Sequence, residues 1–337
     1  MDTGTAVVRT AVALRESQGR WLLPDTLART VGLTDDDFRS AIRSLRQRGF
    51  RIDVRPGGAL RLAIGPDGLD ASEITEGLNT RTIGGAVDVL DEVGSTNDVA
   101  WERLSAGAVD GICVAAESQT AGRGRQGRRW IAPRGTSVLL SVGVTPGLEM
   151  SQASVLTFAA SVAVVEAIRS ATGVAAEIEW PNDVVCGAHK VAGILVEGRR
   201  IRPGAGPAAS AFVIGAGINV NVARGALPAD VRESATSLSA ESGRPVDRIV
   251  LIRHLLRSLD TWYGVLRGGD VALIGRRWLA LSATVGRMLV IEQGGRRFEG
   301  TVVDVSPEDG LAMRLGHGEI RHFRAHAATV AGRTPGR

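Results

Sequence analysis

The sequence predicts an α+β fold in three parts: an N-terminal winged helix-turn-helix, a central α/β domain with a mixed sheet, and a small C-terminal β-barrel. Three observations support this division. Helical periodicity gives way to a strand pair within residues 1–65, strand and helix patterns alternate over residues 66–282, and short strands separated by glycine turns fill residues 283–337. A chain of 337 residues is long enough for two or three domains.

The composition is that of a globular protein, with 44% hydrophobic and 23% charged residues. The most apolar stretch, residues 155–168, is interrupted by polar side chains including Glu166, so it predicts a buried helix and no membrane span. Arg9 and Arg15 lie inside the stretch that would have to be the apolar core of a signal peptide, and they argue against one. Cys113 and Cys186 lie in apolar runs, where free thiols behave as small hydrophobes, and this favours a reduced, cytoplasmic location.

The N-terminal part follows the winged-helix plan. Helical patterns cover residues 7–14 and 24–28, and a third begins at Thr34, with Asp37 three residues on in a capping-box arrangement. Residues 50–64 then alternate apolar and polar on either side of a Pro-Gly-Gly turn, which predicts a two-stranded wing.

Two interpretations of the third helix stay open. Arg39, Arg43 and Arg46 form a basic stripe suited to DNA phosphates. Three aspartates at residues 35–37 occupy the helix end that would approach the bases, and their charge repels phosphates. The unit therefore either binds operator DNA or serves packing or regulation.

The central part begins after a connector with little periodicity, residues 67–86. Strand patterns lie at residues 87–89, 112–118 and 137–144, and a long helix at residues 152–170 is stopped by Gly173. Residues 248–266 form an amphipathic helix. The C-terminal part has strand patterns at residues 288–291, 298–303 and 311–315, which predict a small antiparallel barrel.

A predicted hairpin over residues 177–198 carries the single lysine of the chain, Lys190; the other 39 basic residues are arginines. An ammonium is a compact point charge able to follow an oxygen whose charge changes, which a planar guanidinium does less well. The alternative is a turn lysine without a role. Asn182 and Asp183, just before the first strand, suit a polar ligand or a metal, or equally a turn.

Residues 119–130, QTAGRGRQGRRW, combine glycines with arginines in a flexible cationic loop. Such a loop brings backbone N–H groups and guanidinium groups around phosphate oxygens, although neither a P-loop nor a dinucleotide fingerprint is present. A nucleic-acid patch is the alternative. Upstream, Ser95-Thr96-Asn97 precedes a helical run and is either an N-cap or part of a ligand site.

Taken together, these motifs resemble those of the biotin protein ligases. The matching segments, in order, are STN at residues 95–97, QTAGRGRQGRRW at 119–130, WPND followed by HKVAGILVEG within 180–198, IGAGINVN at 214–221, and ATSL at 235–238. With a winged helix in front, the chain from about residue 5 to 325 resembles the bifunctional type, some members of which repress biotin synthesis.

The resemblance implies a reaction, substrates and partners. Family members activate the carboxylate of biotin with ATP and Mg²⁺, release pyrophosphate, and keep biotinoyl-5'-AMP bound. They then transfer biotin to one lysine of a biotin carboxyl carrier domain of acetyl-CoA carboxylase or a related carboxylase. The resemblance also implies a lipoate ligase-like, class II synthetase-like central domain, an SH3-like C-terminal barrel, a homodimer, operator DNA for the repressor type, and a cytoplasmic location.

The same match implies site residues. The catalytic residues would be Lys190, Arg125 and Asp183, with Asp183 also near Mg²⁺. The biotin site would comprise Ser95, Thr96, Asn97, Gln119, Arg123, Gly124, Arg125, Lys190 and Gly193, and the ATP and adenylate site would comprise Arg125, Arg128, Trp130, Asn182, Lys190 and Asn219.

One position departs from the family pattern: Glu179 precedes WPND, where the family usually has lysine. A carboxylate there would repel an adenylate phosphate. Three alternatives to a bifunctional ligase remain: a ligase for lipoate or another acyl group, a biotinoyl-AMP-sensing repressor with weak ligase activity, and a ligase whose winged helix does not bind DNA.

Overall fold

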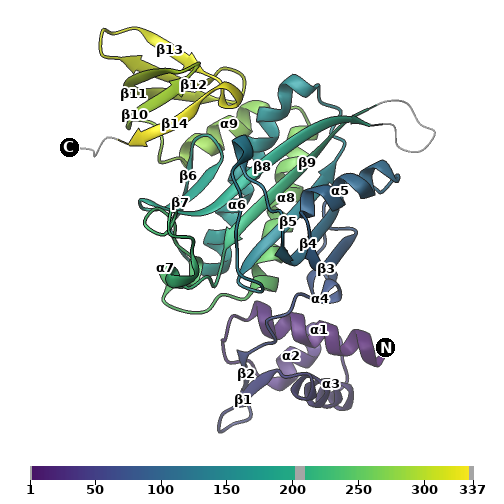
Figure 1. Ribbon diagram of the computed structural model, residues 1–337. Coiled ribbons are helices and arrows are strands. Elements are labelled where there is room, and N and C mark those ends of the chain that lie inside the picture. Colours follow the sequence, from purple (N-terminus) through teal and green to yellow (C-terminus); the bar gives the residue numbers. More distant parts are fainter. Residues whose placement is uncertain (1, 202–208, 334–337) are drawn as a thin grey trace.

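The structure is a computed structural model and describes residues 2–201 and 209–333 (Figure 1). A helical N-terminal unit and a C-terminal five-stranded sheet lie at opposite ends of a central seven-stranded sheet. The predicted α+β class with a central mixed sheet is confirmed.

The N-terminal unit has the predicted order of three helices and a hairpin. Its third helix begins as expected, because the Thr34 hydroxyl accepts a hydrogen bond of 3.2 Å from the Asp37 backbone N–H. Phe38, Ile42 and Leu45 lie on one face of that helix and are buried against the first two helices. The elements are α1 (Thr3–Glu16), α2 (Pro24–Val31), α3 (Asp35–Gln47), β1 (Arg51–Val54) and β2 (Leu60–Ile64).

The central sheet has the strand order β3-β4-β5-β9-β8-β7-β6. β3 runs parallel to β4, and the other neighbouring pairs are antiparallel. The strands are β3 (Val87–Val93), β4 (Ile112–Gln119), β5 (Ser137–Val144), β6 (Ala176–Glu179), β7 (Asp183–Cys186), β8 (His189–Ile201) and β9 (Ala209–Asn219).

Helices cover both faces of this sheet, which explains why its strands read as continuous apolar runs. In β9, Phe212 and Ile214 face the core shared with α6 (Ala153–Thr172) and α8 (Arg248–Arg267), whereas the alternate residues Ala211 and Val213 pack with α5 (Thr96–Ser105). The stretch Met150–Thr172 is apolar and long enough to cross a membrane, but 67% of it is buried inside the protein. Its apolar composition therefore serves the core.

Several elements carry no clear sequence signal. The short helix α4 (Ala71–Thr75), capped by Asp70, lies in the connector, and α7 (Leu238–Ser242) follows β9. α9 (Val271–Ala280) packs on α6 through Trp278 and Phe158, whose rings stack at 4.8 Å. The C-terminal sheet adds two strands to the three predicted, in the order β13-β12-β11-β10-β14: β10 (Met288–Gln293), β11 (Arg296–Ser306), β12 (Gly310–Leu315), β13 (Ile320–Phe323) and β14 (Thr329–Arg333).

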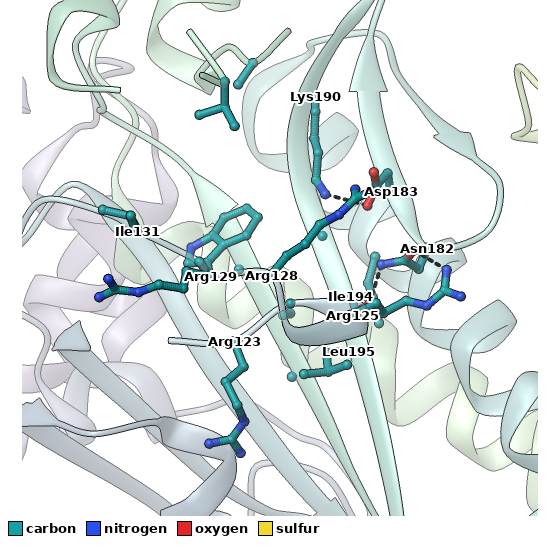
Figure 2. A pocket seen from close by; sticks show the side chains of 18 of the residues that line it. Arg123, Arg125, Arg128, Arg129, Ile131, Asn182, Asp183, Lys190, Ile194 and Leu195 are labelled. Carbon is teal, nitrogen blue, oxygen red and sulfur yellow. Dashed lines mark hydrogen bonds and ion pairs between the residues drawn. The ribbon is translucent and has the colours of Figure 1, made fainter. Parts of the chain in front are cut away.

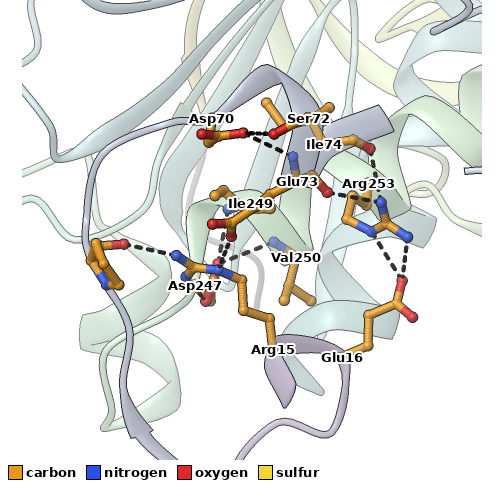
Figure 3. A network of polar contacts seen from close by, with 11 residues as sticks. Arg15, Glu16, Asp70, Ser72, Glu73, Ile74, Asp247, Ile249, Val250 and Arg253 are labelled. Carbon is orange, nitrogen blue, oxygen red and sulfur yellow. Dashed lines mark hydrogen bonds and ion pairs between the residues drawn. The ribbon is translucent and has the colours of Figure 1, made fainter. Parts of the chain in front are cut away.

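A buried ionic network joins the N-terminal unit to the central part (Figure 3). Arg15 of α1 donates to Glu73 of α4 at 2.6 Å, to Asp247 before α8 at 2.5 Å, and to the Pro66 carbonyl at 3.1 Å. Burial alone would lower the pKa of Arg15, but the carboxylates of Asp247 and Glu73 outweigh it and raise that pKa. Arg15 therefore stays charged and holds the connector.

We expect Arg15→Met to lower the free energy of unfolding by about 2 to 4 kcal/mol, because it leaves carboxylates without their buried partner. The matched control on the same helix is Arg9→Met, whose ion pair with Glu76 is half exposed and contributes less than about 1 kcal/mol. Urea denaturation measures both. Equal losses for the two variants would contradict a special role for Arg15.

Candidate active site

One cavity of about 770 Å³ gathers the residues that the sequence motifs predict. It lies between the arginine loop, which we define as residues 122–130, and the strands β7, β8 and β9. Its lining includes fourteen predicted site residues: Ser95, Thr96, Asn97, Gln119, Arg123, Gly124, Arg125, Arg128, Trp130, Asn182, Asp183, Lys190, Gly193 and Asn219. Segments more than 100 residues apart in the sequence thus meet in one place.

A hydrogen-bonded network forms one end of the cavity. The Gln119 side-chain carbonyl accepts from the Thr96 backbone N–H at 2.7 Å and from the Thr96 hydroxyl at 3.0 Å. Asn97 donates to Glu197 at 2.8 Å and accepts from Ser141 at 2.6 Å. These bonds fix the orientation of each polar group, as recognition of a specific polar ligand requires.

Ser95 stands at the N-cap position of α5, but its side chain makes no capping hydrogen bond. It is 97% buried and lines the cavity. Of the two interpretations of the Ser-Thr-Asn motif, the structure therefore favours a ligand site over a side-chain cap.

Glycines let aromatic and polar side chains approach the strands closely. A Cβ on Gly217 would lie 2.6 Å from the indole of Trp130, and one on Gly193 would lie 3.2 Å from the same indole. A Cβ on Gly215 would lie 2.4 Å from the Asn97 side-chain oxygen. Gly193, Gly215 and Gly217 of β8 and β9 thus form a floor without side chains of its own, the glycine floor, on which Trp130 rests with its indole N–H buried and without an acceptor.

Lys190 and Asp183 form an ion pair of 2.6 Å on the side of the cavity where Arg125 and Asn182 also lie (Figure 2). The Asp183 Oδ1 is buried, and the charged group that it faces is the Lys190 ammonium. The Lys190 ammonium also lies 5.7 Å from the centre of the Trp130 ring. The Lys190 backbone N–H donates to the Ser234 carbonyl, and the Lys190 carbonyl accepts from the Thr236 N–H, each at 2.8 Å.

A bulge in the hairpin aims Lys190 into the cavity. Asp183 pairs with Gly193 and Val185 with Lys190, and the register shifts between them. Residues three apart point to opposite faces of a regular strand, so Lys190 and Gly193 share the cavity face only because of this extra residue.

The arginines of the loop have different surroundings. Arg123 donates to both carboxylate oxygens of Asp98 at 2.7 Å and lies 3.5 Å from Glu197, and the bond to Asp98 is the main reason its pKa is raised. Its charge is therefore compensated within the protein. Arg125 donates to Asn182 at 2.9 Å, and burial lowers its pKa. Arg128 is exposed at the cavity edge.

Two segments of the lining carry no motif in the sequence. Residues 227–234 contribute Pro228 and Asp230 among others, and residues 328–330 of the C-terminal sheet close another side. Glu179, the residue that departs from the family pattern, also lines the cavity. Only the fold brings these segments to the motifs, so no local pattern could have identified them.

Comparison with known proteins agrees with this geometry. The model of the biotin/lipoate A/B protein ligase family matches residues 89–219. The bifunctional ligase/repressor BirA of Bacillus spizizenii is 31% identical over 84% of this chain and 86% of its own length. This chain belongs to the biotin protein ligase family. It is thus an enzyme of the ligase class, as the motifs predicted.

Further relatives of this ligase are consistent with that assignment. The biotin--[acetyl-CoA-carboxylase] ligase of Mycobacterium tuberculosis is 33% identical over 71% of this chain and 89% of its own length. The biotin protein ligase from Aquifex aeolicus, solved in complex with biotin and ATP, has the same fold, with a TM-score of 0.62 at 24% identity. The match covers 74% of this chain and 100% of the Aquifex chain.

We expect Gly217→Ala to lower ligase activity by about tenfold or more, because the new methyl group must displace the rigid indole of Trp130 at a cost of about 1 to 3 kcal/mol. The matched control is Gly264→Ala in α8, where the added Cβ meets nothing within 4 Å. Activity and thermal unfolding are measured for both. Unchanged activity in Gly217→Ala would show that the floor does not need to be bare.

Proposed function

We propose that the cavity performs both half-reactions of protein biotinylation: formation of biotinoyl-5'-AMP from biotin and ATP, and transfer of biotin to a lysine of a carboxyl carrier domain. The observation that carries this proposal is that one cavity combines three features: the polar end, the glycine floor, and a cationic side formed by Lys190, Arg125 and Arg128. The named ligands of the Aquifex relative, biotin and ATP, support the choice of substrates.

The biotin ring would lie at the polar end. Thr96, Asn97 and Gln119 offer donors and acceptors for a ureido group, and Ser95 adds a buried hydroxyl with no capping bond. The apolar part of the ligand would lie on the floor beside Gly193. This end holds no unpaired charge from the loop, since Arg123 is paired with Asp98.

The carboxylate of biotin would then face the cationic side. In the first step its oxygen attacks the α-phosphorus of ATP and pyrophosphate leaves. Two anions must meet here, so Lys190, Arg125 and Arg128 supply the positive charge that stabilises the transition state. Trp130, Asn182 and Asn219 line the same side and would contact the adenylate.

In the second step the amine of the acceptor lysine attacks the biotinoyl carbonyl and AMP leaves with its electron pair. Asp183 would accept the proton of the incoming ammonium, since its carboxylate lines the cavity beside Lys190. The acceptor would be the carrier domain of acetyl-CoA carboxylase or a related carboxylase, as the names of the relatives suggest.

We propose that Mg²⁺ binds together with the nucleotide. In residues 2–201 and 209–333, no three His, Cys, Asp or Glu side chains gather as a metal site. Mg²⁺ on a nucleotide needs only one or two protein carboxylates, because phosphates and water complete its shell. Asp183 fits such a role, and the ion would offset phosphate charge there.

Glu179 would limit how well the nucleotide binds. Its side chain lines the cavity in which the phosphates are proposed to lie, and its carboxylate adds negative charge. We therefore expect ATP to bind more weakly than it would with a lysine at this position.

We expect Lys190→Arg to lower biotin-dependent pyrophosphate release by about 100-fold or more, the cost of losing one preorganised charge at the transition state. The planar guanidinium cannot take the place of the compact ammonium beside Asp183. The assay mixes the protein with biotin, ATP and Mg²⁺, and omission of biotin is the blank. No release by the wild-type protein would contradict the proposed function.

A second candidate function is DNA-binding repression, and the charge distribution favours it. Residues 1–65 contain eleven arginines and seven carboxylates, so the whole net charge of +4 lies in the N-terminal unit. We propose that this unit is a winged helix, that residues 66–282 are the ligase domain, and that residues 283–337 are an SH3-like barrel. The protein would be a cytoplasmic homodimer, which presents two winged helices to operator DNA. Arg39, Arg43 and Arg46 are exposed on α3 around one hollow.

A DNA duplex that binds the full-length protein is first selected from random sequence. We expect Arg43→Ala to weaken binding to this duplex and to lower the slope of log K against log salt concentration by about the value of one phosphate contact. Arg29→Ala, on the exposed side of α2, is the matched control and should change neither quantity. Fluorescence anisotropy at several salt concentrations measures both. Failure to select any duplex would leave a ligase whose N-terminal unit does not bind DNA.

A further inference from the structure

The C-terminal sheet forms part of the cavity wall. Ala328, Thr329 and Val330, at the start of β14, line the cavity opposite the glycine floor, about 200 residues from the arginine loop. The sheet is therefore placed to act on the loop directly.

Two side chains at the tip of the loop reach this sheet. One amino group of Arg125 donates to the Ala325 carbonyl, while the other donates to Asn182. The Thr329 hydroxyl accepts a hydrogen bond from the Gln126 side-chain nitrogen at 2.7 Å and lies 3.1 Å from the Gln126 side-chain oxygen, to which it donates. The loop is thus tied on one side to the hairpin and on the other to β14.

The backbone at the tip needs such a tie. Gln126 has a φ of 56°, in the left-handed region that side-chain-bearing residues rarely adopt, and Gly127 follows with a φ of 73°. Local preference does not hold a glutamine in this conformation, so contacts from elsewhere must do so. Across the tip, the Gly124 N–H donates to the Arg128 carbonyl at 2.7 Å, so the Gln126 conformation also sets where Arg128 points.

We propose that Gln126 and Thr329 are positioning residues, which hold the arginine loop closed over the nucleotide end of the cavity. The inference rests on the proposed function. Neither residue touches the reacting atoms; they act by keeping Arg125 and Arg128 in place and by keeping the adenylate from escaping. The polar end, built on α5 and β4, makes no use of this contact.

The test uses the full-length protein with Thr329→Val, which keeps the shape and loses the hydroxyl, and Thr329→Ser, which restores it. Gln126→Asn keeps an amide and tolerates a positive φ, but is one carbon too short to reach Thr329. Thr301→Val, in β11 of the same sheet and outside the cavity lining, is the matched control.

In Thr329→Val and Gln126→Asn, we expect the KM for ATP to rise about 2- to 10-fold, the factor that corresponds to one lost hydrogen bond. Biotin affinity, measured calorimetrically without ATP, should change less than the KM for ATP, because the polar end that holds the ring does not depend on this contact. Escape of preformed adenylate, followed as biotin appearing on a lysine-rich bystander protein, should rise by a similar factor. Thr329→Ser and Thr301→Val should match the wild type, and the double variant should be no worse than either single one.

Wild-type values in Thr329→Val would overturn the positioning role while leaving the ligase assignment intact. A loss of biotin affinity equal to the loss for ATP would also overturn it, because that pattern indicates general disruption. Absence of pyrophosphate release from the wild type would instead contradict the proposed function itself, so the two failures are distinguishable.

Discussion

The ion pair between Lys190 and Asp183 is the contact around which the cavity is arranged. A charged pair in a partly buried place persists only if neighbouring groups fix both partners. Here the bulge in the hairpin turns Lys190 to the same face as Asp183, the segment at residues 234–236 holds its backbone, and the Trp130 ring lies beside its ammonium. The bare floor of β8 and β9 is a consequence, because any Cβ on Gly193 would press on Lys190 and Trp130.

The sequence predicted the motif residues that line the cavity better than the segments that complete its wall. The motif residues could be found because each motif keeps its chemical groups within a short span, and the mixed sheet was expected from the family resemblance. The bulge between Val184 and Val185 could not be predicted, since it depends on pairing with a partner strand. The same holds for Thr329: β14 is a strand of only 5 residues, and its place beside the loop arises from tertiary packing alone.

The almost complete use of arginine has a structural counterpart. Arg253 donates to Glu16 and to the carbonyls of residues 73, 74 and 76, and Arg248 bonds Glu117 together with two backbone carbonyls. A planar guanidinium with five N–H donors can satisfy several fixed acceptors at once, whereas an ammonium cannot match such a fork. The one lysine stands beside a single carboxylate, where a compact charge fits, so its surroundings differ from those of the buried arginines.

These arginines also determine how the N-terminal unit is attached. Asp247 and Arg248 are neighbours at the start of α8; Asp247 accepts from Arg15 of α1, and Arg248 donates to Glu117 of β4 and to the Asp67 carbonyl of the connector. Directional bonds of this kind specify an orientation more than they add stability. The unit is therefore held at a defined angle to the ligase sheet, so that the arginines on α3 keep a constant position relative to the cavity.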